Sequence, residues 1–515
     1  MGLAILQSRA QLGTAAPLVT IEVFLSGGLP AFSIVGMPET AVRESKDRVR
    51  GAILSSGFKF PQERITVSLG PADMRKTGGR FDLAIALGIL AASRQIPTHR
   101  FAQQEFFGEL ALNGELRAVP GVLPAAIKAR EAGHDLFVAT DNVAEATLTH
   151  NVVRGAATLT QMAGHLNGVS EIAVSERQPF TEAVLPSVEL ADVKGQTLAK
   201  RALEIAAAGG HNLIFVGPPG TGKSMLARRL PGLLPAMSER EALQTAAVNS
   251  VLGHSLNPEV WRQRPFRAPH HTASAAALVG GGAGPQPGEV SRAHNGVLFL
   301  DELPEFNRNV LEVLREPLET GSITIARAEN QLEFPAAVQL IAAMNPCPCG
   351  YLGDSSGDCS CSALRVDAYR AKISGPLLDR IDLQVAVGRP PTEVLRRRGP
   401  CGETSQQVAK RVVAARKAQQ ARNVSSNSQL DSQAIDRYCV LDDASLSLLD
   451  QAVDQFRLSV RAYHRVQRVA RTIADLAGEP SISSAHVAEA LLLRQGPRHA
   501  AGAAVNRPPA RTREK

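Results

Sequence analysis

A glycine-rich segment near the middle of the chain has the residue types of a phosphate-binding loop. An apolar run at residues 212–216 leads directly into it, and a helix-like stretch follows. The segment reads Gly217, Pro218, Pro219, Gly220, Thr221, Gly222, Lys223, Ser224. Glycines allow backbone N–H groups to converge on phosphate oxygens at a helix N-terminus, where Lys223 reaches the β- and γ-phosphates and Ser224 ligates Mg²⁺. The spacing therefore predicts an ATP site with bound Mg²⁺.

Two later strand ends carry polar residues suited to hydrolysis. The apolar run 296–300 ends in Asp301 and Glu302, and the run 336–344 ends at Asn345. Asp301 can hold the Mg²⁺ water shell, Glu302 can deprotonate the attacking water, and Asn345 can sense the γ-phosphate. An asparagine before a proline is also a common turn residue, so Asn345 alone would be weak evidence.

Arg380 lies in the segment GPLLDRID. A guanidinium stays charged at any physiological pH and can stabilise transition-state charge from a neighbouring subunit, which would require an oligomer. The alternative is a surface arginine paired with Asp379 or Asp382.

Four of the six cysteines are clustered, at Cys347, Cys349, Cys359 and Cys361. Four thiolates suffice for a closed tetrahedral site, and Zn²⁺ is the metal expected there. The Cys-x-Cys spacing is tighter than the usual Cys-x2-Cys, so free thiols remain the alternative.

The elements that must position these residues alternate between strands and helices. The pattern predicts an α/β domain over 1–165, a linker over 166–190 and a doubly wound parallel sheet over 191–390. A helical lid is expected over 391–495, and a basic disordered tail over 496–515. No uncharged apolar run is long enough to span a bilayer and no secretory signal is evident, so we expect a cytoplasmic protein that does not contact a membrane. The net charge of +7 makes polyanions plausible partners without identifying one.

With these motifs in view, the sequence resembles the ComM/YifB family of magnesium-chelatase-like AAA+ ATPases. The resemblance extends over nearly the whole chain, through SGGLPAFSIVGMPE, RPFRAPHHTAS, AHNGVLFLDELPEF, AAMNPCPCGY, GPLLDRIDL and SVRAYHRVQRVARTIADL. It implies a hexameric ring that binds single-stranded or branched DNA and acts as a branch-migration helicase in homologous recombination during natural transformation.

The same resemblance assigns further roles. It places Gln196 at the nucleotide, makes Arg380 the arginine finger and makes Arg461 the second sensor, with Arg465 and Arg468 close by on the same helix. Residues 321–334 fit a hairpin before the sensor strand, and Arg327 on it is a candidate DNA contact. The stretch from Arg264 through the glycine-rich residues 279–288 fits an insertion in the second helix of the core. Its candidate DNA contacts are Arg267, His270 and His271. Both segments could instead be ordinary surface loops, and the lid arginines an exposed basic face.

The first domain resembles the Lon-protease-like (S5 domain 2-like) fold, through MRKTGGRFDLAIALGIL and FFGELALNGELRAVPGVLPAAIKAREAG. Lon-type proteolysis needs a serine nucleophile with a lysine base. The corresponding positions hold Arg80 and Leu123, which cannot do that chemistry. We therefore expect a catalytically inactive domain. The competing functions are the motor subunit of a metal chelatase and another remodelling ATPase that does not act on DNA.

Overall fold

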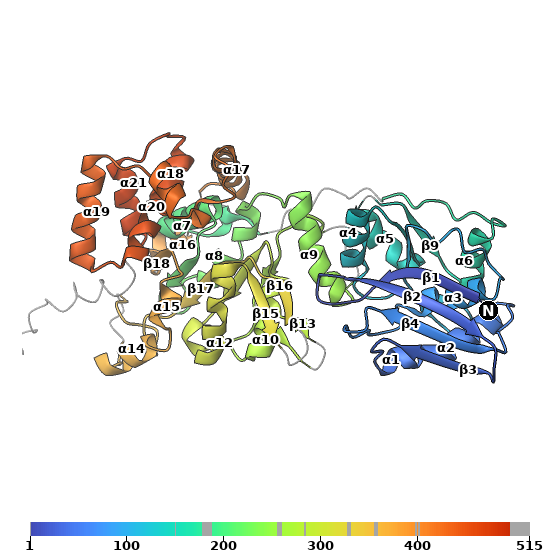
Figure 1. The fold of residues 1–515 in the computed structure, drawn as a ribbon. Helices are drawn as coiled ribbons and strands as arrows, with labels where there is room; N and C mark the ends of the chain where they lie inside the picture. Colours follow the sequence, from blue (N-terminus) through green and yellow to red (C-terminus); the bar gives the residue numbers. More distant parts are fainter. Residues whose placement is uncertain are drawn as a thin grey trace, which may run out of the picture.

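The computed structural model describes residues 2–149, 151–177, 188–254, 260–282, 285–326, 331–354, 359–396, 399 and 402–494. The chain forms three units arranged in sequence order (Figure 1). An N-terminal α/β domain packs against helix α9 (Glu239–Val251), which belongs to a central α/β core. A helical lid packs on the far side of that core.

The N-terminal domain is built on a mixed seven-stranded sheet in the order β3-β4-β2-β1-β5-β8-β9. The strands are β1 (Gly2–Arg9), β2 (Leu18–Ser26), β3 (Ala31–Val35), β4 (Arg64–Gly70), β5 (Gln104–Phe106), β8 (Asp135–Ala139) and β9 (Val153–Ala156). Strands β6 (Glu109–Leu110) and β7 (Leu116–Arg117) form a separate short pair. The helices are α1 (Thr40–Arg43), α2 (Ser45–Ser55), α3 (Asp82–Ala92), α4 (Val122–Ala132), α5 (Val143–Ala146) and α6 (Leu159–Leu166). Helix α3 is buried along its whole length, which explains why its sequence is apolar all round rather than amphipathic.

The central core contains a five-stranded parallel sheet in the order β11-β14-β17-β10-β18. Its strands are β10 (Leu213–Val216), β11 (Phe266–Arg267), β14 (Val297–Leu300), β17 (Gln339–Met344) and β18 (Leu383–Ala386). Strands β10 and β14 are buried at every residue because helices cover both faces of the sheet, which accounts for their uninterrupted apolar sequences. The predicted doubly wound sheet is confirmed.

Helices and two hairpins surround this sheet. The helices are α7 (Thr197–Gly209), α8 (Lys223–Ala227), α9, α10 (Ala275–Val279), α11 (Glu289–Arg292), α12 (Arg308–Glu312), α13 (Pro317–Thr320), α14 (Ala363–Arg370), α15 (Gly375–Leu378) and α16 (Thr392–Arg396). We call β12 (Gly280–Gly281) with β13 (Gln286–Pro287) the insert hairpin, and β15 (Ser322–Ala326) with β16 (Gln331–Pro335) the pre-sensor hairpin. The pre-sensor hairpin lies within the segment 321–335, and the insert hairpin lies in the glycine-rich segment 279–288.

The lid is helical, with α17 (Ser405–Ala421), α18 (Ser432–Tyr438), α19 (Asp443–Phe456), α20 (Val460–Ala477) and α21 (Ser484–Leu492). Helix α20 begins after Ser459, whose side chain accepts a hydrogen bond from the N–H of Ala462, and ends at Gly478 in the left-handed conformation. Its buried face packs against α7, so lid and core share one apolar cluster. Within the described residues, no helix is long and apolar enough to cross a membrane.

Candidate functional site

The phosphate-binding loop joins β10 to α8, at the carboxyl edge of the central sheet. Gly217 is required there, because a Cβ atom would lie 2.0 Å from the carbonyl oxygen of Val387. Gly220 and Gly222 have φ values of 75° and 90°, which favour glycine. Lys223 Nζ donates hydrogen bonds to the carbonyl oxygens of Gly217 and Pro218 at 2.7 and 2.8 Å. The local sequence therefore builds a compact loop that holds its lysine inward.

The predicted hydrolytic residues gather around this loop. Ser224 Oγ donates to Asp301 Oδ2 at 2.5 Å, which brings the two expected Mg²⁺ ligands together. Asn345, one residue beyond the end of β17, accepts a hydrogen bond from Lys223 Nζ at 3.1 Å. Glu302 follows Asp301 in the left-handed conformation, with φ of 53°. Strands β10, β14 and β17 are neighbours, and their carboxyl ends bring these residues to one edge.

The electrostatics of this edge suit a triphosphate. Burial lowers the pKa of Lys223, and the charges of Asp301 and Glu302 oppose that shift. When a nucleotide and Mg²⁺ bind together, the phosphate supplies a negative charge for the partly desolvated lysine, and Mg²⁺ supplies a positive charge for the two carboxylates. Gln196 Nε2 donates to the carbonyl oxygens of Thr221 and Gly388, at 3.2 and 2.7 Å, so this predicted nucleotide residue contacts the back of the loop.

Arg380 lies at the opposite edge of the sheet. Its carbonyl oxygen accepts a hydrogen bond from Asn212 Nδ2 at 2.9 Å, and Asn212 immediately precedes β10. The Arg380 guanidinium contacts Glu319 and donates to the carbonyl oxygen of Pro376 at 2.6 Å. One strand length of about 13 Å separates this end of β10 from the phosphate-binding loop. Arg380 is therefore displaced from the nucleotide site of its own chain.

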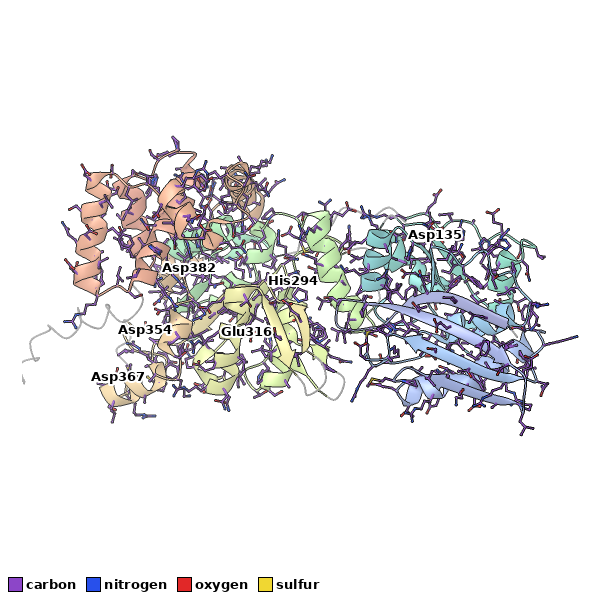
Figure 2. All side chains as sticks on the ribbon, viewed as in Figure 1. Asp135, His294, Glu316, Asp354, Asp367 and Asp382 are labelled. Carbon is purple, nitrogen blue, oxygen red and sulfur yellow. The ribbon has the colours of Figure 1, made fainter. Side chains whose placement is uncertain are left out.

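A cavity of about 1250 Å³ opens beside Arg380, between core and lid. Its charged lining residues are Arg262, Arg264, Arg380, Arg416, Lys417, Arg465, Arg468, Glu241, Glu319, Asp382 and Asp431. Asp382 lies where the lid meets the core (Figure 2). Although burial opposes its ionisation, a hydrogen bond from His211 and the charge of Arg465 keep the pKa of Asp382 below its usual value. The cavity therefore combines basic side chains from core and lid.

The lid arginines fall on the Arg380 side as well. Arg465 lies 3.5 Å from Asp382, and Arg468 lines the same cavity. Arg461, one turn earlier on α20, is exposed. The pKa of Glu319 is lowered mainly by the hydrogen bond from Arg380, and the charge of Arg461 lowers it further. The structure thus groups Arg380 with the α20 arginines, and Lys223 with Asp301, Glu302 and Asn345.

Comparisons with known proteins agree with this architecture. Three family models match, described as magnesium chelatase, subunit ChlI over residues 189–395, subunit ChlI of Mg-chelatase over 21–142, and magnesium chelatase, subunit ChlI C-terminal over 402–494. The competence protein ComM of Haemophilus influenzae is 51% identical over 497 residues, which cover 95% of this chain and 97% of that protein. The chain belongs to the ComM/YifB family.

Other members are similarly close. The protein YifB of Escherichia coli is 46% identical, with 96% of this chain and 97% of that protein covered. Similarity to a chelatase itself is much shorter, since the magnesium-chelatase 38 kDa subunit of Acidiphilium rubrum is 30% identical over 179 residues, or 30% of this chain. The predicted family and fold class are therefore confirmed, and the chain is a magnesium-chelatase-like AAA+ protein.

The cysteine cluster follows directly after Asn345. The Sγ atom of Cys347 lies 3.3 Å from that of Cys349 and 3.8 Å from that of Cys359, and the Cys349–Cys359 separation is 3.6 Å. All four sulfur atoms, including that of Cys361, lie within 4.8 Å of one another. Tetrahedral zinc with Zn–S bonds of about 2.3 Å needs sulfur atoms about 3.8 Å apart, so the residues fit that ion.

The loop that carries these cysteines also contacts the phosphate-binding loop. Gly350 has φ of 87°, and a Cβ atom there would lie 2.7 Å from Cδ of Pro219. A hydrogen bond from the backbone N–H of Tyr351 is the largest cause that lowers the pKa of Cys349, to about 6. The cysteine cluster is thus placed to fix the positions of Asn345 and Pro219 relative to each other.

The candidate DNA contacts have varied environments. Arg327 lies outside the described residues. Arg267 forms two hydrogen bonds with Glu289, at 2.7 and 2.9 Å, next to the insert hairpin. His270 Nδ1 lies 2.9 Å from Thr272 Oγ1. The two hairpins are neighbours, because a Cβ atom on Gly280 would lie 3.1 Å from Cδ1 of Ile325.

His271 has a contact that the sequence did not predict. Its Nδ1 atom lies 3.2 Å from Oε2 of Glu302, the expected general base. His271 follows β11 and Glu302 follows β14, and these strands are parallel neighbours. The signal that could have found this contact is the same one that predicted Asn345, namely a polar residue just beyond the end of a strand.

The two positions that correspond, by resemblance, to a Lon-type dyad lie at an interface between domains. Arg80 is buried and donates to Gln11 Oε1 at 2.7 Å, and burial lowers its pKa to about 10. Gln11 Nε2 in turn donates to the carbonyl oxygen of Val251, at the end of α9. The backbone N–H of Leu123 donates to Ser250 Oγ at 3.3 Å.

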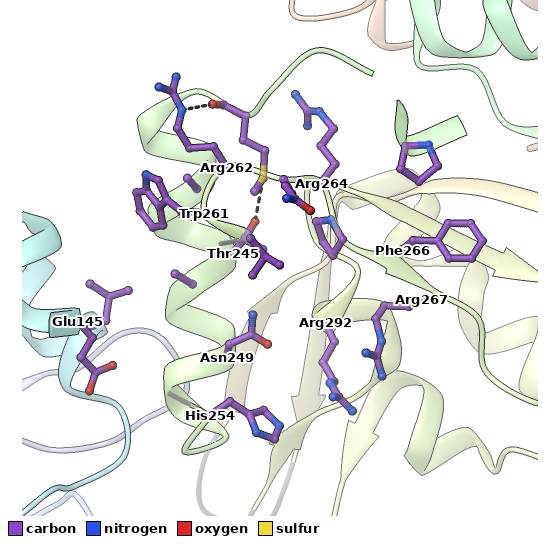
Figure 3. A pocket seen from close by; sticks show the side chains of 18 of the residues that line it. Glu145, Thr245, Asn249, His254, Trp261, Arg262, Arg264, Phe266, Arg267 and Arg292 are labelled. Carbon is purple, nitrogen blue, oxygen red and sulfur yellow. Dashed lines mark hydrogen bonds between the residues drawn. The ribbon is translucent and has the colours of Figure 1, made fainter. Parts of the chain in front are cut away.

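The Leu123 side chain belongs to an apolar cluster with Met237, Ala242 and Trp261. A cavity of about 650 Å³ adjoins this contact, with Glu145 facing α9 across it (Figure 3). Helix α9 thus lies against the face on which a Lon-type dyad would stand.

Proposed function

We propose that this protein is a ring-forming ATPase motor in which each nucleotide is hydrolysed between two subunits. The separation of Arg380 from Lys223, at opposite edges of one sheet, is the observation that carries the proposal. An arginine that cannot reach its own phosphates can reach those of a neighbour when copies pack head to tail, and such heterologous contacts close into rings. Following the family resemblance, we propose a hexamer.

We further propose that its load is DNA, and that it acts as a branch-migration helicase or translocase during recombination of transforming DNA. The near full-length similarity to a protein named for competence supports this assignment. The insert and pre-sensor hairpins lie side by side, and glycines such as Gly280 and Gly281 let a backbone approach phosphates closely. Such contacts would carry little sequence specificity.

The decisive experiment measures ATP hydrolysis with no DNA, with single-stranded DNA and with a four-way junction. We expect junction DNA to stimulate turnover and the junction to be resolved into two duplexes only when ATP is hydrolysed. Glu302→Gln should bind ATP without hydrolysing it, because an amide cannot accept the proton of the attacking water. An active ATPase that is not stimulated by DNA and does not process the junction would contradict the DNA assignment.

The rival function is a chelatase motor or another remodelling ATPase that does not act on DNA. The family models named for magnesium chelatase support it. The short match to a chelatase subunit counts against it, compared with coverage of nearly the whole ComM protein. ATP turnover that is indifferent to every DNA form would favour this rival.

We also propose that the four clustered cysteines bind one structural Zn²⁺. Four soft ligands at tetrahedral separations form a closed site, which leaves no open position for catalysis. Elemental analysis of the purified protein should find about one zinc per chain, consistent with a single four-ligand site. Metal-free protein with unchanged stability and four thiols open to alkylation would contradict the proposal.

A further inference from the structure

Asn212 immediately precedes β10, at the edge of the central sheet where Arg380 lies. Its side-chain amide makes two hydrogen bonds to segments that are distant in the chain. Nδ2 donates to the carbonyl oxygen of Arg380 at 2.9 Å, and Oδ1 accepts from the backbone N–H of Leu340 at 2.8 Å. A carbonyl oxygen can only accept and an N–H can only donate, so these two partners fix which way the amide faces.

The backbone of Asn212 is also bonded to the segment that carries Arg380. Its N–H donates to Asp382 Oδ2 at 3.3 Å, and its carbonyl oxygen accepts from the N–H groups of Asp382 and Leu383, both at 3.0 Å. The preceding residue, His211, lies 3.2 Å from the same Asp382 oxygen through its Nδ1 atom. Residues 380–383 are therefore fixed to Asn212 through side chain and backbone together.

The Arg380 side chain depends on this attachment for its position. Its guanidinium contacts Glu319 and donates to the carbonyl oxygen of Pro376, while its buried Nε atom has no hydrogen-bond partner within the part of the chain that the structure describes. Rotation about the single bonds of an arginine moves the guanidinium through a wide arc, so a shift of the backbone displaces it directly. Asn212 fixes the carbonyl group of that backbone.

The second hydrogen bond of Asn212 leads to the nucleotide site of the same subunit. Leu340 lies near the start of β17, and Asn345, one residue beyond the end of that strand, accepts a hydrogen bond from Lys223. Strand β17 is paired on both sides, with β10 and β14, which keeps it straight between these two points. One amide therefore joins the strand that ends at a subunit's own phosphate-binding loop to the segment that carries Arg380.

We infer that Asn212 is a positioning residue, which sets Arg380 relative to β17 so that the guanidinium reaches the nucleotide of the neighbouring subunit. The inference rests on the proposed hydrolysis between subunits and names a residue that determines the geometry of that site without touching the nucleotide. No covalent step is involved. Loss of the amide donor displaces Arg380 and leaves the phosphate-binding loop of the same subunit in place.

The first test compares Asn212→Asp with the unaltered protein, measuring kcat, KM for ATP and the midpoint of thermal unfolding. The aspartate keeps an oxygen for the Leu340 N–H, but it turns a second oxygen instead of a donor toward the Arg380 carbonyl. We expect kcat to fall at least about tenfold, since a misplacement of about 1 Å can cost about a hundredfold. KM should stay within about twofold, as for any loss confined to the transition state. An unchanged kcat would overturn the inference.

Gln339→Glu is the matched control, because it makes the same amide-to-carboxylate change at the same end of the sheet. Gln339 Nε2 donates to the carbonyl oxygens of Ala206 and His211, both at 2.8 Å, rather than to the segment with Arg380. The lost hydrogen bonds should lower the unfolding midpoint about as much as in Asn212→Asp, yet kcat should stay within about twofold of the unaltered value. An equal loss of kcat in the two variants would show a general effect of destabilisation and overturn the inference.

Mixed rings show to which active site the defect belongs. If Asn212 acts through Arg380, Asn212→Asp still supplies an intact Glu302, so mixing it in equal amounts with Glu302→Gln should restore about a quarter of the unaltered rate. Mixing it with Arg380→Ala should add nothing to the activities of the two variants measured apart, because neither supplies a well-placed arginine. Any other pattern overturns the inference, and recovery with Arg380→Ala would place the defect in the subunit's own nucleotide site.

Failure of the proposed function gives a different result. An unaltered protein without ATPase activity defeats the motor assignment and the role of Asn212 together. So does a reference mixture of Arg380→Ala with Glu302→Gln that recovers no activity, since Arg380 would then not act between subunits. If the reference mixture recovers and the mixture of Asn212→Asp with Glu302→Gln does not, only the role of Asn212 is overturned. Asn212→Ala, which adds no charge and should show the same pattern, decides the matter should Asn212→Asp unfold.

Discussion

Replacing Arg380 by alanine should abolish hydrolysis while ATP binding persists. The backbone of Arg380 lies one strand length, about 13 Å, from the phosphate-binding loop of its own chain, so Lys223, Ser224 and Asp301 remain intact in the variant. Removing an arginine that stabilises phosphoryl transfer costs about 10³-fold in kcat, or about 4 kcal/mol. Nucleotide affinity should change far less, because the cis contacts are untouched.

A mixing experiment separates action in trans from action in cis. Arg380→Ala keeps Glu302, and Glu302→Gln keeps Arg380, so each inactive variant supplies what the other lacks. In rings that assemble at random from equal amounts, about one quarter of the interfaces join a good Glu302 to a good Arg380. Hydrolysis should therefore recover to about a quarter of the unaltered rate. If Arg380 acted in cis, no subunit in the mixture would be complete.

Lys417→Ala is the control, since Lys417 lines the same cavity and carries the same charge. It should retain most activity, because a solvated lysine of the cavity wall contributes only to the general field. A mixture no more active than its two components would refute the reasoning from sheet geometry. So would a Lys417→Ala variant as impaired as Arg380→Ala.

Three further outcomes follow from close contacts. Gly217→Ala should abolish ATP binding measured with a fluorescent nucleotide, because its Cβ atom meets the Val387 carbonyl oxygen 2.0 Å away and the loop must shift. Cys359→Ser should lose zinc by elemental analysis and raise KM for ATP, as the cysteine loop no longer braces Pro219. Leu123→Ala should lower the free energy of unfolding by about 2–4 kcal/mol in denaturant titrations, the cost of a cavity at a buried leucine. Unchanged nucleotide affinity in Gly217→Ala would contradict the first prediction. Unchanged KM in Cys359→Ser would contradict the second, and unchanged stability in Leu123→Ala would contradict the third.

The grouping of the candidate nucleotide-site residues was predictable because the position of each is set by local sequence. Lys223 and Ser224 follow β10 directly, and Asp301 and Asn345 lie at or just beyond the ends of buried apolar strands whose parallel pairing brings their carboxyl ends together. The doubly wound core followed from the same alternation. Sequence periodicity carries this information because each motif is contiguous with the strand that positions it.

Contacts between distant segments were not predictable. The contact of His271, a candidate DNA contact, with Glu302 is one of them, and it arises because the order of strands places β11 beside β14. Likewise, the sequence led us to expect Arg80 and Leu123 at the positions of a Lon-type dyad, but it did not indicate that both lie near α9. Such contacts depend on how whole elements pack, and no local pattern encodes that packing.

The interface around Arg80 and Leu123 places the N-terminal domain against elements of the central core. Gln11, which follows β1, donates a hydrogen bond to the carbonyl oxygen of Val251 at the end of α9. Leu12 belongs to an apolar cluster with Leu332 and Phe334 of the pre-sensor hairpin. The domain therefore contacts both α9 and the pre-sensor hairpin, which lies beside the insert hairpin. A Lon-type active site must stay open for its substrate, whereas a face closed by α9 cannot admit one. We therefore expect the face that would hold a Lon-type dyad, which α9 covers, to support the neighbouring elements of the core rather than to bind a substrate.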